Sequence, residues 1–121
     1  MAYLCHCQDC RRFTGTSFHH NATFDEKDVK ITKPEKADLD KVLTVWGDDG
    51  TRQFCSKCGS GLFLTVGSKV ESMAGKIIVT VGTIDEGESN PALKPSMEGF
   101  CKRREPWMKG VEGAMELQEW G

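Results

Sequence analysis

The sequence contains no long hydrophobic run: its uninterrupted apolar segments are short, and residues 77–79 are typical of them. A transmembrane helix needs about 20 consecutive apolar residues, so we expect no membrane span. The first residues, Met-Ala-Tyr-Leu-Cys, also lack the basic and apolar segments of a secretory signal peptide. We therefore expect a reducing compartment, the cytoplasm or the nucleus.

An excess of positive charge is also missing. Sixteen Lys and Arg residues stand against eighteen Asp and Glu residues, which gives a formal net charge of −2. The summed field of the chain would therefore not hold a polyanion or an acidic membrane surface. We do not expect a nucleic-acid-binding protein.

Aliphatic and aromatic core residues are scarce. Leu, Ile, Val and Phe together make up 25 of the 121 residues, close to the roughly 20% below which chains tend to be disordered. The length fits a single domain, which we place at residues 1–121. Its core should be thin and should need an additional staple.

Sustained helical periodicity is absent, and short runs of β-branched and aromatic residues occur instead. One helical turn is expected after Cys10, ended by Gly15. Residues 47–50, Gly-Asp-Asp-Gly, predict a hairpin turn, and the bend at Pro106 should bury the indole of Trp107. Strands are predicted at residues 16–24, 29–31, 42–46, 51–54, 62–66, 76–81 and 97–102. The predicted architecture is mostly β, with twisted antiparallel sheets pinned by a metal.

What the sequence does contain is six cysteines, five of them in two tight clusters. Cys5, Cys7 and Cys10 form C-x-C-x-x-C, and Cys55 and Cys58 form C-x-x-C. In a reducing compartment such clusters suit one ion better than separate disulfides. Zinc is the expected ion because it accepts tetrahedral thiolate ligation without redox chemistry.

The spacing leaves open how the five sulfurs divide among sites. In one division, Cys7, Cys10, Cys55 and Cys58 form a single closed structural site, and Cys5 is a spare thiol. In the other, Cys5, Cys7 and Cys10 hold one zinc by themselves and leave a coordination position open for water or substrate. Cys55 and Cys58 would then belong to a second site.

Four motifs, in order and at matching separations over about residues 3–107, resemble the glutathione-dependent formaldehyde-activating enzyme family, which includes centromere protein V-like domains. They are C-H-C-Q-D-C-R-R-x-x-G at 5–15, R-x-F-C-x-x-C-G-S-x-L-F at 52–63, V-G-T-I-D at 81–85 and K-R-R-x-P-W at 102–107. The resemblance implies a complex of coiled antiparallel β-sheets pinned by zinc, similar to zinc-containing methionine sulfoxide reductases.

The resemblance also implies roles for the cysteines. Cys5, Cys7 and Cys10 would hold a catalytic zinc with an open position. Cys55 and Cys58 would be half of a structural four-thiolate zinc site, completed in the family by an earlier C-x-C-G hairpin. This sequence lacks that hairpin, so we expect a chain that is N-terminally truncated relative to the family.

The implied reaction is that of a zinc-dependent carbon–sulfur lyase acting on a small-molecule thiol adduct, such as S-(hydroxymethyl)glutathione formed from glutathione and formaldehyde. The alternative is a non-catalytic, zinc-stabilised protein-binding module with a single structural four-cysteine site. Among accessory residues, Arg11, Arg12 and Arg52 could grip substrate carboxylates. At most one of the adjacent His19 and His20 should face the site, because neighbouring strand residues point to opposite faces.

Overall fold

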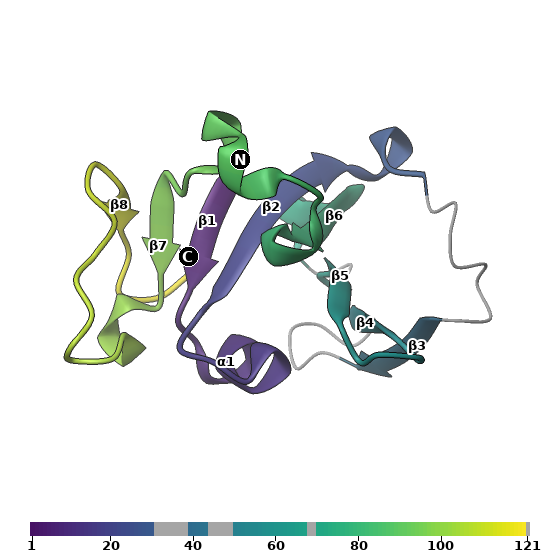
Figure 1. Cartoon of the computed structure of the whole chain (residues 1–121), viewed down its shortest axis with the longest axis horizontal. Helices are drawn as coiled ribbons and strands as arrows, with labels where there is room; N and C mark the ends of the chain where they lie inside the picture. Colours follow the sequence, from purple (N-terminus) through teal and green to yellow (C-terminus); the bar gives the residue numbers. More distant parts are fainter. Residues whose placement is uncertain (31–38, 44–49, 68–69, 121) are drawn as a thin grey trace.

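A computed structural model shows one helix at the end of a strongly twisted sheet (Figure 1). It describes residues 1–30, 39–43, 50–67 and 70–120, and for 39–43 the backbone alone. The helix is α1 (Gln8–Thr14). The strands are β1 (Ala2–Cys5), β2 (His19–Asp25), β3 (Leu39–Leu43), β4 (Thr51–Cys55), β5 (Gly61–Thr65), β6 (Lys76–Thr80), β7 (Met97–Gly99) and β8 (Met115–Glu116). Short 3-10 turns are η1 (Glu26–Asp28), η3 (Glu71–Met73), η4 (Val81–Thr83), η5 (Gly87–Ser89), η6 (Pro91–Leu93) and η7 (Cys101–Arg103).

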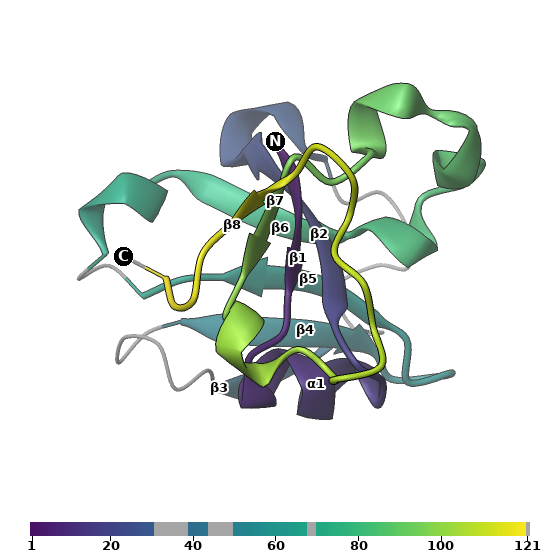
Figure 2. The same ribbon diagram turned by 90° about the vertical axis from the view of Figure 1, so that its left-hand side faces the viewer.

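Within the described residues, the eight strands form one sheet in the order β3-β4-β5-β6-β2-β1-β7-β8. Neighbouring strands are antiparallel except for the pairs β1–β7 and β7–β8, which are parallel. Figure 2 shows β1 and β2 crossing the direction of β4 and β5, so the sheet is coiled rather than flat. The predicted mostly β, coiled architecture is confirmed, with a mixed rather than a purely antiparallel sheet.

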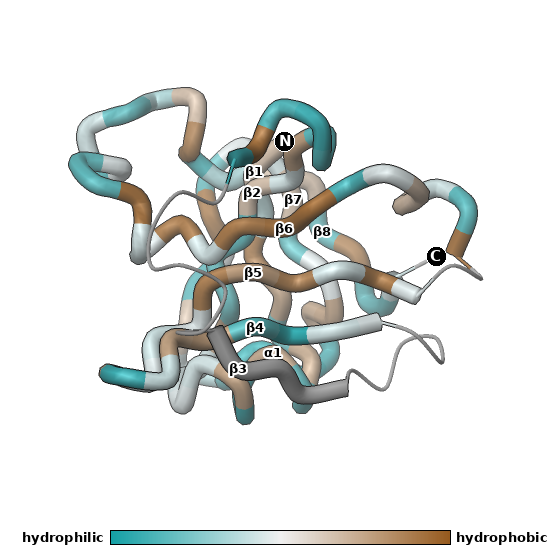
Figure 3. The backbone as a smooth tube through the Cα atoms, turned by 90° about the vertical axis from the view of Figure 1, so that its right-hand side faces the viewer, coloured by the Kyte–Doolittle hydropathy of each residue, from teal (hydrophilic) through white to brown (hydrophobic). Residues whose placement is uncertain are grey.

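The core is thin, as the composition predicts. The largest buried aliphatic side chains come from β1, β5, β6 and η4, and Figure 3 shows the hydrophobic stretches along β5 and β6. They are Leu4, Leu64, Ile77, Ile78 and Val81. Two alanines, four cysteines and five polar side chains are also buried among the described residues. Much of the core is therefore built from groups that need specific partners.

Helix α1 begins and ends where its sequence dictates. Cys7 is the extended N-cap residue, and its sulfur accepts a hydrogen bond from the backbone N–H of Cys10 at 3.4 Å. Arg11 and Arg12 lie in the last turn, where positive charge complements the helix dipole. Gly15 ends the helix with φ +69°, a left-handed conformation that favours glycine. The predicted helical turn is confirmed and starts earlier than expected.

Most predicted strands are confirmed to within a few residues. β2, β5 and β6 match the runs at 16–24, 62–66 and 76–81, and β3 pairs with β4 as the hairpin signal predicts. Residues 44–49, which include Trp46 and the first three residues of the expected turn, lie outside the described residues. No strand forms at Val29 or Lys30, and Ile31 also lies outside the described part.

Two predictions near the C-terminus are wrong. The strand expected at 97–102 stops at Gly99, because Phe100 adopts a left-handed conformation (φ +54°) and residues 101–103 form η7. Trp107 is 75% exposed rather than buried. This segment is anchored instead just before Pro106, where Arg104 forms an ion pair with Glu116 and Glu105 forms one with Arg11.

In the part of the chain that the structure describes, no helix has the length and apolar character needed to cross a bilayer.

Candidate metal centre

Three cysteines meet at the junction of β1 and α1. Cys5 is the last residue of β1, Cys7 caps α1, and Cys10 lies in its first turn. Their sulfur atoms all lie within 4.8 Å of one another, and all three residues are buried. Among the described residues, this is the one group of three or more potential ligand side chains close enough to share an ion. The group could hold a metal ion.

Each of the three sulfurs accepts an N–H hydrogen bond from a described residue. The backbone N–H of Cys10 donates to Cys7 at 3.4 Å, the guanidinium of Arg52 donates to Cys10 at 3.6 Å, and the indole of Trp120 donates to Cys5 at 3.2 Å. N–H donors aimed at sulfur stabilise the thiolate form over the thiol. The cluster is therefore arranged for negative charge on sulfur.

The three thiols cannot all ionise in the absence of a cation. Hydrogen bonds from the side chains of Cys10 and Cys5 lower the pKa of Cys7 to about 2. The pKa of Cys10 is raised by its contacts with Cys5 and Cys7 and by burial. The pKa of Cys5 is also raised, because Cys7 and burial outweigh the lowering effect of Cys10. A bound divalent cation would remove this repulsion, so the donor set fits a thiophilic metal such as zinc.

Arg52 reaches the cluster from β4. Its side chain is only 8% exposed and lies over the ring of Phe13, with 5.0 Å between the guanidinium carbon and the ring centroid. One guanidinium nitrogen, Nη2, contacts Cys10, whereas the buried Nη1 has no hydrogen-bond partner among the described residues. A buried cationic donor with a free N–H beside a metal centre is suited to hold an oxygen atom of a ligand.

His19 lies on the same side of the sheet. It is paired with Cys5 across β1 and β2, and its ring lies 5.5 Å from that of Phe13. Burial, then the charge of Arg52, lowers the pKa of His19 to about 4, so its imidazole is neutral at pH 7. Its Nε2 contacts Thr80 Oγ1 at 2.8 Å, and its buried Nδ1 has no partner among the described residues.

His20 points to the other face, where its Nε2 donates to the Leu93 carbonyl at 2.8 Å. The prediction that at most one of the two histidines faces the site is therefore confirmed. A cavity of about 420 Å³ lies beside His20. None of the three clustered cysteines lines it, so it is separate from the metal centre.

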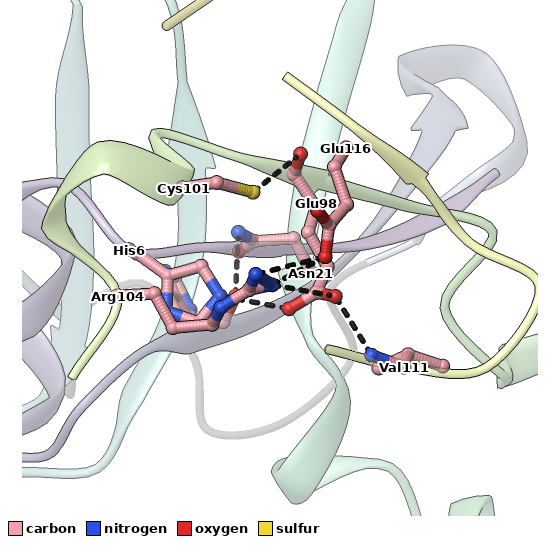
Figure 4. A network of polar contacts seen from close by, with 8 residues as sticks. His6, Asn21, Glu98, Cys101, Arg104, Val111 and Glu116 are labelled. Atoms are coloured by element: carbon pink, nitrogen blue, oxygen red, sulfur yellow. Dashed lines mark hydrogen bonds and ion pairs between the residues drawn. The ribbon is translucent and has the colours of Figure 1, made fainter. Parts of the chain in front are cut away.

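A buried polar network holds the backbone between Cys5 and Cys7 (Figure 4). The imidazole Nε2 of His6 lies 2.9 Å from Glu98 Oε1, which directs this side chain into the network. Glu98 Oε2 accepts the backbone N–H of Val111 at 2.7 Å and lies 3.5 Å from Arg104. Burial opposes ionisation of Glu98, but the bonds from His6 and Val111 and the charge of Arg104 lower its pKa below the usual range.

Cys55 and Cys58 do not join the three-cysteine cluster. Cys55 ends β4 and is half-buried, whereas Cys58 is exposed in a tight turn in which Gly59 has φ +77°. The Gly59 N–H donates to the Cys55 carbonyl at 2.8 Å, which closes the turn. Hydrogen bonds from Ser60 lower the pKa of Cys58. The structure thus separates the two motifs and does not form the single four-cysteine site.

The other candidates fall outside the cluster. Arg11 forms an ion pair with Glu105, and Arg12 is exposed. Cys101 is buried and donates its S–H to the Glu98 carbonyl at 3.4 Å. Sequence reasoning missed Glu98 and Trp120 as parts of the site. Neither belongs to a motif. Glu98 reaches the site through the pairing of β7 with β1, and Trp120 follows β8, which pairs with β7. Each lies more than 90 residues in sequence from the residue that it contacts.

A comparison with known protein families identifies one that covers most of the chain. The family model described as "Glutathione-dependent formaldehyde-activating enzyme" matches residues 1–103, most of the 121-residue chain. The matched region contains both cysteine motifs, Arg52 and His19, whereas Trp120 lies beyond it. No curated protein matches the chain.

The pKa directions predict how many protons a metal displaces. At pH 7 the free cluster holds Cys7 as a thiolate and Cys5 and Cys10 as thiols. Zinc should therefore release about two protons per ion, and its affinity should fall about a hundredfold for each unit of decreasing pH. Calorimetric titration in buffers of different ionisation enthalpy measures this release. A Cys55→Ser/Cys58→Ser variant confines the measurement to one cluster, and release of no protons would contradict the assignment.

Proposed function

The chain belongs to the glutathione-dependent formaldehyde-activating enzyme family, and from this premise we propose that it is a zinc-dependent carbon–sulfur lyase. Its substrate would be a glutathione adduct such as S-(hydroxymethyl)glutathione. The observation that carries the proposal is the set of three buried, mutually close sulfurs, each of which accepts an N–H hydrogen bond from a described residue.

Cys5, Cys7 and Cys10 would hold the reactive zinc. Zinc bound by three protein ligands supplies a Lewis acid with one position for an exchangeable sulfur or oxygen ligand. Cys55 and Cys58 would supply two ligands of a second, structural site. Their short turn and partial exposure suit a metal-binding knuckle.

The reaction joins the sulfur of glutathione to the carbonyl carbon of formaldehyde. A C–S bond forms, the C=O double bond becomes a single bond, and the thiol proton moves to the oxygen; the reverse reaction breaks the same C–S bond. Negative charge develops on the oxygen during this step. The Nη1 of Arg52, which has no hydrogen-bond partner among the described residues, is a donor suited to that charge.

His19 is the proposed proton carrier. Its neutral ring has a nitrogen, Nδ1, without a partner in the described part of the chain, and the ring contacts Phe13, over which Arg52 also lies. A neutral imidazole can accept the thiol proton and return it to the oxygen. Arg52 and His19, which both contact the Phe13 ring, thus place a hydrogen-bond donor and a proton acceptor on the same side of the cluster.

The proposed partner is therefore a small thiol adduct rather than a macromolecule. Three thiolates stay available for zinc only where thiols remain reduced, so we propose that the protein works in the cytoplasm, or in the nucleus.

Replacing one sulfur tests the proposal. Cys10→Ser should lower the rate of S-(hydroxymethyl)glutathione formation by at least about a hundredfold. Replacing a residue that only hydrogen-bonds a metal ligand lowers activity by about 10- to 100-fold, and loss of the ligand itself should lower it more. Exchange NMR with glutathione and formaldehyde measures the rate, and elemental analysis measures zinc. Cys101→Ser is the matched control, a buried thiol outside the cluster, and should keep both. An active Cys10→Ser protein would refute the catalytic role. A single zinc ion per chain whose binding requires Cys55 and Cys58 would support the alternative, a non-catalytic module with one structural four-cysteine site.

Arg52→Met should lower kcat/KM by about ten- to a hundredfold, since a hydrogen bond from a charged donor contributes about 1.5–3 kcal/mol. Methionine keeps much of the buried side-chain volume, and Arg52→Lys should recover part of the rate through its charge. Steady-state kinetics and zinc content are measured together. Arg12→Met removes an exposed guanidinium and should change neither. Unaltered kinetics in a zinc-loaded Arg52→Met protein would exclude a role for Arg52 in the reaction.

A further inference from the structure

The segment beyond the family match reaches back to the metal centre through one residue. Trp120 is half-buried, and its indole Nε1 donates to Cys5 Sγ at 3.2 Å. Its ring meets that of Tyr3 edge to face, with 5.3 Å between the centroids. Tyr3, Phe100 and Trp120 together pack against the buried cysteines.

The fold makes room for this indole. Gly99 lies beside Cys5 in the parallel pairing of β1 and β7. A Cβ atom at position 99 would overlap the six-membered ring of Trp120. Glycine is thus required where the indole crosses the strand.

The position of Trp120 is fixed by its own segment. The Leu117 N–H donates to the Glu98 carbonyl at 2.9 Å, and the Leu117 carbonyl accepts the Cys101 N–H at 2.9 Å. Arg104 bonds Glu116 at 2.6 and 2.8 Å. These bonds anchor the chain only three residues before the indole.

We propose that Trp120 is a positioning residue of the metal centre, acting through Cys5. This inference rests on the proposed zinc site. Its N–H withdraws electron density from the Cys5 thiolate, and its ring covers the cluster on that side. Three thiolates make zinc a weak Lewis acid because they donate negative charge to it. A hydrogen bond to a ligating sulfur reduces the charge that this sulfur donates. The C-terminal segment would thereby raise the electrophilicity of the centre and leave the side of Arg52 for substrate.

Cobalt substitution tests the proposal without measuring turnover. Trp120→Phe keeps an aromatic ring and removes the N–H, so the sulfur-to-cobalt charge-transfer band should move to longer wavelength. A thiolate without its donor gives up an electron more easily. Trp107→Phe is the matched control at an exposed indole and should leave the band unchanged. A cobalt-loaded Trp120→Phe protein with the wild-type band would overturn the role of Trp120.

The outcomes separate this inference from the proposed function. A wild-type protein that shows no sulfur-to-cobalt band would overturn the zinc site and with it the role of Trp120. A normal wild-type band with no shift in Trp120→Phe would overturn the role of Trp120 alone.

A second measurement avoids replacing Trp120. The chain has three tryptophans, so Trp46→Phe/Trp107→Phe leaves Trp120 as the one indole. Zinc should change its fluorescence, because metal binding converts the adjacent thiol of Cys5 into a metal-bound thiolate. Emission that does not respond to a stoichiometric amount of bound zinc would overturn the proposed contact with Cys5.

Discussion

Repulsion among three enclosed sulfur atoms is the constraint on which the site depends. Buried within 4.8 Å of one another, the sulfurs of Cys5, Cys7 and Cys10 cannot all carry negative charge unless a cation lies among them. A structural zinc site can contribute on the order of 10 kcal/mol to folding. The described part of the core has few large aliphatic residues, so the fold has reason to use such a contribution.

The surrounding fold supplies what the three cysteines do not. Each sulfur receives an N–H from a different part of the molecule: the backbone of α1, the side chain of Arg52 in β4, and the indole of Trp120 near the C-terminus. The pairing of His6 with Glu98 fixes the backbone between Cys5 and Cys7. The sheet therefore acts chiefly by bringing distant donors to one short motif.

The local features of this protein could be predicted from its sequence, and the long-range ones could not. The C-x-C-x-x-C spacing and Gly15 predict α1 and the cluster, because ligands two and three residues apart meet within one turn. Hydrophobicity alone favours burial of Trp107 as much as of Trp120. Trp120 rather than Trp107 is the more buried because β8 pairs with β7 in a register that places the Trp120 indole over Gly99, which has no side chain to block it. The contact of Arg52 with Cys10 likewise depends on strand order, which no local motif specifies.

The open zinc site is tested most directly by diffraction from zinc-loaded crystals grown under reducing conditions, with anomalous data at the zinc absorption edge. We predict a peak bonded to the sulfurs of Cys5, Cys7 and Cys10, with water or a small thiol as the fourth ligand. A peak enclosed by four protein sulfurs that include Cys55 or Cys58, or no peak among the three cysteines, would contradict the account.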